Sequence, residues 1–419
     1  MQYFKRIGVY AICGLFLLSG CVTSGGGFGG KQLTESIIGP KLSSFFDPKR
    51  KAEIDPRKTK LEIIVPVFDP GLSEDAKKYK EDGIWPELRR AESNRFAHKL
   101  KIALEDTNAF GAVRVTPDST ATGDLYVLGK IIESNGEKIE IEIKVVDISG
   151  KHWFTRFFAG SVEPEYYKNI RNNGKDPYDP VFEEASNRIA LELENYKTEQ
   201  IETLNRVADL RFGANFSSEV FSEYMTVENG KVTLASFPSE DDPMLKRTRA
   251  IRVRDQLFVD GLQDEYRSFS DNMESSYLIW QKQSLLEIEA KQDAQLKAAG
   301  EYAIGVAAIA LAVAAVVAGS DPNSSNVGTS TAVMTGGIVA GAAGISMLQK
   351  GFQTSDEAKI HRDTLNEVGE SINVDLAPRV IAFEEKTLEL TGDAKEQFSQ
   401  WRGFLQKIYV QEQTPENKL

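Results

Sequence analysis

The sequence predicts an α+β protein in which a small mixed or antiparallel sheet packs against helices and a mainly helical region follows. Three observations support this class. Short β-branched runs bounded by turn residues predict strands, and apolar residues recurring every three or four positions predict helices. Strand and helix patterns mix in the first half of the chain, whereas helical patterns dominate the second half. A length of 419 residues predicts two or three domains.

The overall composition excludes several protein classes. With 27% charged and 41% hydrophobic residues, the chain is neither collagen-like, nor a coiled-coil rod, nor wholly disordered. A net charge of −12 argues against nucleic-acid binding, which needs a positive surface. The two cysteines, Cys13 and Cys21, are too few for a cysteine-based zinc site or a disulfide framework.

The N-terminus carries a predicted targeting segment over residues 1–20. Lys5 and Arg6 precede an apolar run at 7–18, which is too short to span a membrane as a helix. Leu18-Ser19-Gly20-Cys21 matches the bacterial lipobox, in which the cysteine is acylated, with palmitate or a similar chain, and becomes the mature N-terminus. The alternative is an ordinary secretory signal followed by an incidental cysteine. We expect residues 21–59 to form the lipidated Cys21 and a flexible tether.

The destination of such a lipoprotein depends on the residue after the cysteine. Asp at that position typically retains a lipoprotein in the inner membrane, and this chain has Val22 there. We therefore expect an outer-membrane lipoprotein that faces the periplasm, with no free thiol left after the signal has been removed and Cys21 modified.

Residues 60–197 are predicted to form an α/β domain. Its expected elements, in order, are a strand at 60–68, a helix at 85–107, strands at 112–115, 124–134, 138–148 and 153–159, and a helix at 177–197. Asn135-Gly136, between two of these strands, is a strong hairpin signal. In the strand after it, isoleucines alternate with charged residues, which predicts one buried face and one solvated face.

This region resembles the superfamily of the curli-secretion lipoprotein and the TolB N-terminal domain. The resemblance rests on four pieces in a fixed order: the strand KLEIIVPVF, a helix ending in EDTNAFGAVRVTP, the strand GDLYVLGKI and the hairpin IKVVDISGKHW. It covers about residues 60–197 and implies a periplasmic domain that works in envelope assembly or secretion, often as a ring. It implies no catalytic residues.

Residues 198–298 are predicted to be a helical or coiled region. Asn229-Gly230 indicates a small hairpin within it. A long helix is expected over 255–297, because aromatic and aliphatic residues recur there at helical spacing.

Residues 299–351 form a Gly- and Ala-rich segment whose composition differs from the rest of the chain. Between 302 and 349 the only charged residue is Asp321. Two apolar arms, 302–319 and 331–348, flank a polar turn at 320–326, which predicts a helical hairpin. Each arm would be about 27 Å long as a helix. The hairpin-packing residues are expected to be Gly337, Ala340, Gly341 and Gly344, whose small side chains allow the close helix approach of a glycine zipper.

Three interpretations of the 302–349 hairpin stay open. It inserts in a membrane as a pair of transmembrane helices, it is buried in an assembly interface, or it packs inside the folded protein. The arms are rich in Ala and Gly rather than Leu, which weakens membrane insertion. An apolar segment of this size left exposed would nevertheless exceed the patches that monomers tolerate.

Residues 352–419 are predicted to form a helix–strand–helix region. We expect a helix over 355–376, a strand pair over 379–391 and a final helix over 394–409. In the final helix, the residues expected to face inward are Phe398, Trp401, Leu405 and Ile408.

No pattern in the sequence predicts catalysis. The nucleophile-elbow, phosphate-loop and dinucleotide-binding motifs are absent, and the histidines, His98, His152 and His361, lie far apart. His98, on the predicted helix at 85–107, is expected to be a surface or boundary residue rather than a ligand. The acidic turn at 176–180 is expected to be a solvated loop rather than a calcium site. We therefore expect no catalytic residue, no metal site and no cofactor apart from the covalent lipid on Cys21.

These observations favour a non-enzymatic lipoprotein that acts as an assembly or scaffold factor of an envelope or secretion machine. Its partners would be the membrane, through the lipid and in one interpretation the 302–349 hairpin, and a second copy or an envelope protein. Two further hypotheses are an oligomeric pore built from the hairpin and a hydrolase that uses paired carboxylates. This chain differs from the curli-secretion family in one respect. That family spans membranes with β-hairpins, whereas the most membrane-like segment of this chain is predicted to be helical.

Overall fold

A computed structural model describes the protein over residues 41–42, 52, 59–75, 77, 79, 84–318, 356–383 and 386–411. The predicted signal peptide, Cys21 and nearly all of the predicted tether lie outside these residues. The polar turn and second arm of the predicted 302–349 hairpin lie outside them as well.

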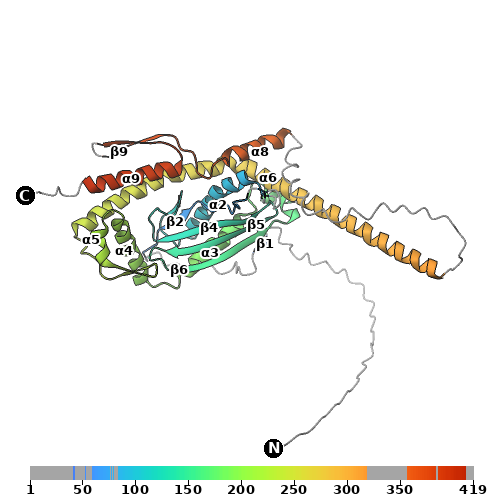
Figure 1. The fold of residues 1–419 in the computed structure, drawn as a ribbon, viewed down its shortest axis with the longest axis horizontal. Coiled ribbons are helices and arrows are strands. Elements are labelled where there is room, and N and C mark those ends of the chain that lie inside the picture. The colour runs from blue at the N-terminus through green and yellow to red at the C-terminus, as the bar shows by residue number, and fades with distance from the viewer. Residues whose placement is uncertain are drawn as a thin grey trace, which may run out of the picture. The chain divides into compact units, whose positions relative to one another are not determined.

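The centre of the fold is a mixed sheet with the strand order β1-β6-β5-β4-β2-β3 (Figure 1). Its strands are β1 (Lys41–Leu42), β2 (Ile63–Pro66), β3 (Val113–Thr116), β4 (Leu125–Ser134), β5 (Lys138–Asp147) and β6 (His152–Ser161). β2 runs parallel to both β3 and β4, and the other neighbours are antiparallel. Parallel pairing of β2 and β3 is possible because helix α2 (Pro86–Asp106) connects them. The predicted α+β class is confirmed.

The hairpin between β4 and β5 confirms the prediction made from Asn135-Gly136. Gly136 has a φ of +92°, which side-chain-bearing residues rarely adopt, and the Asn135 side chain accepts from the backbone N–H groups of Glu137 and Lys138. In β5 the predicted alternation also holds, because Ile139, Ile141, Ile143 and Val145 are all buried. One face of the sheet therefore belongs to the core.

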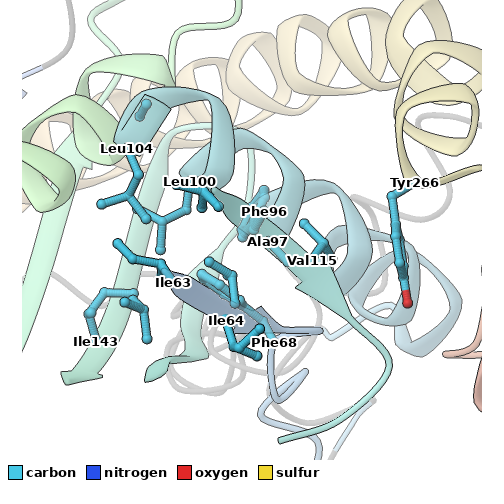
Figure 2. Packing of buried hydrophobic residues seen from close by; sticks show 14 of the residues in the cluster. Ile63, Ile64, Phe68, Phe96, Ala97, Leu100, Leu104, Val115, Ile143 and Tyr266 are labelled. Atoms are coloured by element: carbon cyan, nitrogen blue, oxygen red, sulfur yellow. The ribbon is translucent and has the colours of Figure 1, made fainter. Parts of the chain in front are cut away.

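Two helices, α2 and α3 (Asp179–Leu193), pack against β-strands and against each other. Figure 2 shows Leu100 and Leu104 of α2 pointing toward Ile63 of the sheet, while Tyr266 approaches from a different helix near Val115. Phe96 of α2 meets Phe182 of α3 edge to face, with 5.2 Å between ring centroids. These contacts tie the two predicted helices to the sheet.

The next part of the chain is mainly helical, as predicted. It contains α4 (Thr198–Ala214), α5 (Ser218–Phe221), the short 3₁₀ turn η3 (Ser222–Tyr224) and the hairpin of β7 (Met225–Glu228) and β8 (Lys231–Leu234). Two other 3₁₀ turns, η1 (Pro164–Lys168) and η2 (Ile170–Asn172), lie earlier in the chain, between β6 and α3. Asn229 and Gly230, with φ of 51° and 76°, form the predicted two-residue turn.

The long helix α6 (Pro243–Ala318) is the largest single element. It begins twelve residues before the predicted start at 255, because Pro243 fits the first turn, where no backbone N–H donor is needed. It also continues past 297, so the first predicted hairpin arm is the end of α6 rather than a separate helix. In Figure 1 it is the helix that changes from yellow to orange.

α6 covers the edge of the sheet at β3. The side-chain amide of Gln263 accepts from the N–H of Val115 and donates to its C=O, both at 2.9 Å. The amide thus takes the place of a neighbouring strand at an edge that would otherwise offer unpaired backbone groups. Beside it, Arg114 of β3 donates to both carboxylate oxygens of Asp260, at 2.6 and 3.2 Å.

The C-terminal region consists of α8 (Asp356–Val368), β9 (Arg379–Phe383), β10 (Lys386–Leu390) and α9 (Ala394–Gln411). The predicted strand pair and final helix are confirmed, and the four residues expected to face inward from α9 are buried. The helix predicted over 355–376 is shorter than expected. The chain leaves α8 at Gly369, where a Cβ would lie 2.0 Å from the carbonyl oxygen of Glu87. Asn94 of α2 then donates to the Ile372 carbonyl at 2.8 Å, a long-range bond that holds the segment out of the helix.

In the described part of the chain, no helix combines the length and the apolar character that crossing a membrane requires.

We predict that Gln263→Leu destabilises the protein by about 2 kcal/mol, because the N–H and C=O of Val115, a fully buried residue, would both lose their partner. Urea unfolding measures the change. Asp264→Asn is the matched control, since this neighbouring side chain is 79% exposed and its removal should change stability by less than about 0.5 kcal/mol. Equal stability of the two variants would show that the edge does not need the Gln263 amide.

Candidate functional site

The site residues predicted from sequence are Cys21, Gly337, Ala340, Gly341 and Gly344, and all of them lie outside the described residues. The structure therefore does not test the lipid attachment or the glycine packing. Among the described residues, no group of three or more His, Cys, Asp or Glu side chains is arranged to hold a metal ion.

The prediction for His98 is wrong. Its side chain is only 4% exposed, because α6 and α8 cover the side of α2 that faces away from the sheet. Burial, together with Lys101, lowers the pKa of His98 to about 4, so the ring is neutral at neutral pH. The remaining histidines are not close partners of it: His152 contacts Thr155 on β6, and His361 of α8 contacts Ser276 of α6.

The acidic turn at 176–180 is also different from the prediction of a solvated loop. Asp176 is 4% exposed, and its carboxylate forms an ion pair with Arg95 of α2 at 2.7 Å. Gln281 of α6 donates to its other oxygen at 3.0 Å. Burial alone would raise the pKa of Asp176, but the Arg95 guanidinium, the Lys99 ammonium group and the hydrogen bond from Gln281 together outweigh this effect and hold the pKa below its usual value. Asp176 thus holds the turn against Arg95 of α2 and Gln281 of α6.

A buried carboxyl group, Glu92, lies next to this ion pair on α2. Its Oε1 accepts from the Ser134 hydroxyl at 2.5 Å and from the Tyr277 hydroxyl at 2.8 Å. Burial raises the pKa of Glu92 to about 7, although Arg89, 3.5 Å away, opposes the shift. We call Glu92, Arg95, Asp176, Tyr277 and Gln281 the buried polar cluster. It joins α2, the turn before α3 and α6, which are remote in sequence.

A second polar group surrounds an open pocket of about 340 Å³, where the α/β region meets α4 and the first part of α6. The residues lining this pocket are Lys60, Glu62, Asp124, Asn205, Asp209, Arg249, Arg252, Val253 and Gln256. Six of them carry charge, three of each sign. We call this the Arg252 pocket.

Arg252 is the centre of the ion pairs in this pocket. Its guanidinium lies 2.6 Å from Asp209 and 3.2 Å from Glu62, and it is 3.8 Å from Asp124. Arg249 holds the second oxygen of Asp209 at 2.8 Å. Each of the three carboxylates therefore lies within 4 Å of an arginine.

Asp124 forms the floor of the Arg252 pocket. Its side chain is 2% exposed and accepts from the backbone N–H of Glu62 at 2.8 Å. With its amide nitrogen turned toward this carboxylate, Asn205 donates to both oxygens, at 2.8 and 3.2 Å. Burial raises the pKa of Asp124 to about 6, against the opposing effect of Arg252.

Sequence reasoning missed both groups of residues. Their members lie on segments separated by dozens of residues and share no motif, so only the packing of α6 against α2, β3 and α4 brings them together. A polar residue at an otherwise core-facing position of α2, such as Glu92, is the one signal in the sequence that could have pointed to the buried polar cluster.

Comparison of the chain with protein families, curated proteins and solved structures finds no match for it.

We predict that Glu92 makes stability depend on pH. Its folded-state pKa of about 7 exceeds the ordinary value of 4.5, so its stabilising contribution is complete below pH 4.5 and is lost as the pH rises toward and through 7. The loss amounts to about 3 kcal/mol. Glu92→Gln should remove this component, which makes the variant more stable than the parent protein at pH 8 and similar to it at pH 4.5.

Urea unfolding at both pH values measures this difference. Glu105→Gln is the control, because this carboxylate of α2 is 45% exposed and should leave the pH dependence unchanged. If the parent protein and Glu92→Gln show the same change in unfolding free energy between the two pH values, the Glu92 carboxyl does not titrate as described.

Proposed function

We propose that this protein is an outer-membrane lipoprotein that faces the periplasm and acts as a non-enzymatic assembly or scaffold factor of a cell-envelope or secretion machine. The observation that carries this proposal is the continuity of α6. One helix runs from the ion pairs of the folded region into the uncharged segment that begins near 302. The proposed lipid on Cys21 would hold the chain at the membrane.

α6 is attached firmly enough to serve as a support for that segment. Tyr277 and Gln281 bind it to α2 and to the turn before α3, and Trp280 and Leu285 are buried beside them. Leu285 is the last buried side chain of α6 among those described. From there to Ala318 the helix rises by about 50 Å, at 1.5 Å per residue.

After Ala318 the chain comes back to α6 at α8, and this contact supports the predicted hairpin. Ser276 of α6 and His361 of α8 contact each other, with 3.1 Å between hydroxyl oxygen and ring nitrogen. Ala318 lies 42 residues after Ser276, and His361 lies 43 residues after Ala318. The 43 residues between Ala318 and His361 are therefore enough chain for a turn and a second arm that return to Ser276, as a glycine-zipper hairpin packed through Gly337, Ala340, Gly341 and Gly344 requires.

The resemblance of residues 60–197 to the superfamily of the curli-secretion lipoprotein and the TolB N-terminal domain supports a role in envelope assembly. A sheet packed with helices, from which one long helix continues into an uncharged segment, can bind a second copy or an envelope protein without any chemistry of its own. In this proposal the hairpin is buried in protein, within the fold or in the assembly.

We predict that the Cys21→Ser variant, exported through a cleavable secretory signal, appears in the soluble periplasmic fraction after carbonate washing. Without the lipid, only the 302–349 hairpin could keep the protein in the membrane, and a hairpin buried in protein cannot do so. The parent protein, which retains Cys21, should stay in the outer-membrane pellet. A Cys21→Ser variant that stays in the pellet as well would contradict the scaffold proposal.

The alternative function is an oligomeric, membrane-inserting pore built from the hairpin. The same continuity of α6 favours it, because a helix fixed to the folded region could carry a second helix into a bilayer. This alternative predicts that purified mature protein releases a fluorescent dye from liposomes, and that Gly337→Leu with Gly341→Leu abolishes the release by separating the helices. Replacement of the exposed Lys246 by Gln should leave leakage unchanged. Absence of leakage by the parent protein would exclude the pore.

A further inference from the structure

We propose that the Arg252 pocket binds a small zwitterion, a free short peptide or amino acid that carries both an ammonium and a carboxylate group. This binding site does not depend on the membrane role of the protein, and it would exist in a scaffold or a pore alike.

The size and position of the pocket suit such a ligand. Its volume of about 340 Å³ is at the lower end of the range for small-molecule sites. It lies where the start of β2, the start of β4, α4 and α6 meet, so four segments contribute its walls. Their side chains are held in place by mutual ion pairs rather than by a ligand, which means that the cavity is formed before binding.

The balance of charge selects the ligand class. Three carboxylates and three cationic groups line the pocket, so a singly charged ligand would leave one sign in excess in a partly desolvated space. A ligand with one charge of each sign keeps the balance and can satisfy both kinds of side chain.

The carboxylate end of the ligand would bind at the rim. Lys60 donates one hydrogen bond, to the carbonyl of Asn108, and an ammonium group has three N–H donors. Arg249, whose side chain is 36% exposed, pairs with Asp209 and with the exposed Glu240. Both cations are therefore accessible to an anionic group from the solvent.

The ammonium end of the ligand would face the floor of the Arg252 pocket, which Asp124 forms. Glu62, with a side chain that is 26% exposed, is the acceptor there, and the charge of the nearly buried Asp124 lies behind it. Burial raises the pKa of Asp124, and a neighbouring ammonium would oppose that shift by stabilising the charged carboxylate. Val253 also lines the pocket, is 53% exposed and offers an apolar surface to the alkyl part of the ligand.

The test uses mature, lipidated protein in detergent and isothermal titration calorimetry with the dipeptide Ala-Ala. N-acetyl-Ala-Ala lacks the ammonium group and Ala-Ala-amide lacks the carboxylate. We expect Ala-Ala to bind and each derivative to bind at least about tenfold more weakly, which corresponds to about 1.4 kcal/mol. If Ala-Ala does not bind at millimolar concentrations, or if all three compounds bind equally, the proposal is wrong.

Two variants test whether the ligand binds in the Arg252 pocket. Arg249→Gln removes the rim partner of the carboxylate and should weaken Ala-Ala binding at least about tenfold, while Val253→Trp should fill the mouth of the pocket and abolish binding. The control is Arg267→Gln, a change on the same helix at a side chain that is 59% exposed. Thermal unfolding confirms that each variant is folded. Unchanged binding by a folded Val253→Trp variant would overturn the assignment of the site.

Discussion

The ion pair between Arg95 and Asp176 is the constraint on which the arrangement of this protein depends. Both side chains are buried, and removal of one partner from such a pair typically costs about 3–5 kcal/mol because the other charge is left unpaired. The pair is completed by α6, since Gln281 binds Asp176 and the Tyr277 ring lies 4.6 Å from the Arg95 guanidinium. Displacement of α6 by one turn would leave buried polar groups without partners, so the cluster fixes the position of the helix as well as stabilising it.

Because α6 is one continuous helix, fixing it at the buried polar cluster also fixes the positions of its earlier turns. Gln263 meets the backbone of Val115 at the sheet edge, and Arg252 reaches the carboxylates of Glu62, Asp124 and Asp209. The helix thus contacts the α/β region through polar side chains at three places. Hydrophobic contacts supply the cohesion between these layers, whereas the polar contacts determine the register.

This arrangement connects the two functional proposals. The Arg252 pocket lies near the start of α6, and the uncharged segment lies at its end, so both belong to one continuous element. A scaffold lipoprotein needs a rigid connection between the part held in the folded domain and the part that meets a partner. A small zwitterion bound between α4, α6 and the sheet would contact the base of that connection.

The sequence by itself determined the local structure of this protein and is the basis of its proposed location at the outer membrane. Alternating isoleucines determined β5, Asn229-Gly230 determined a hairpin turn, and apolar spacing determined the buried face of α9, because each pattern acts over a few residues. Tertiary structure decided where α8 ends, why His98 is buried and how the acidic turn at 176–180 is used. These outcomes depend on contacts between segments far apart in the chain, such as Asn94 with Ile372 and Arg95 with Asp176, and no local pattern encodes a partner that only packing brings near.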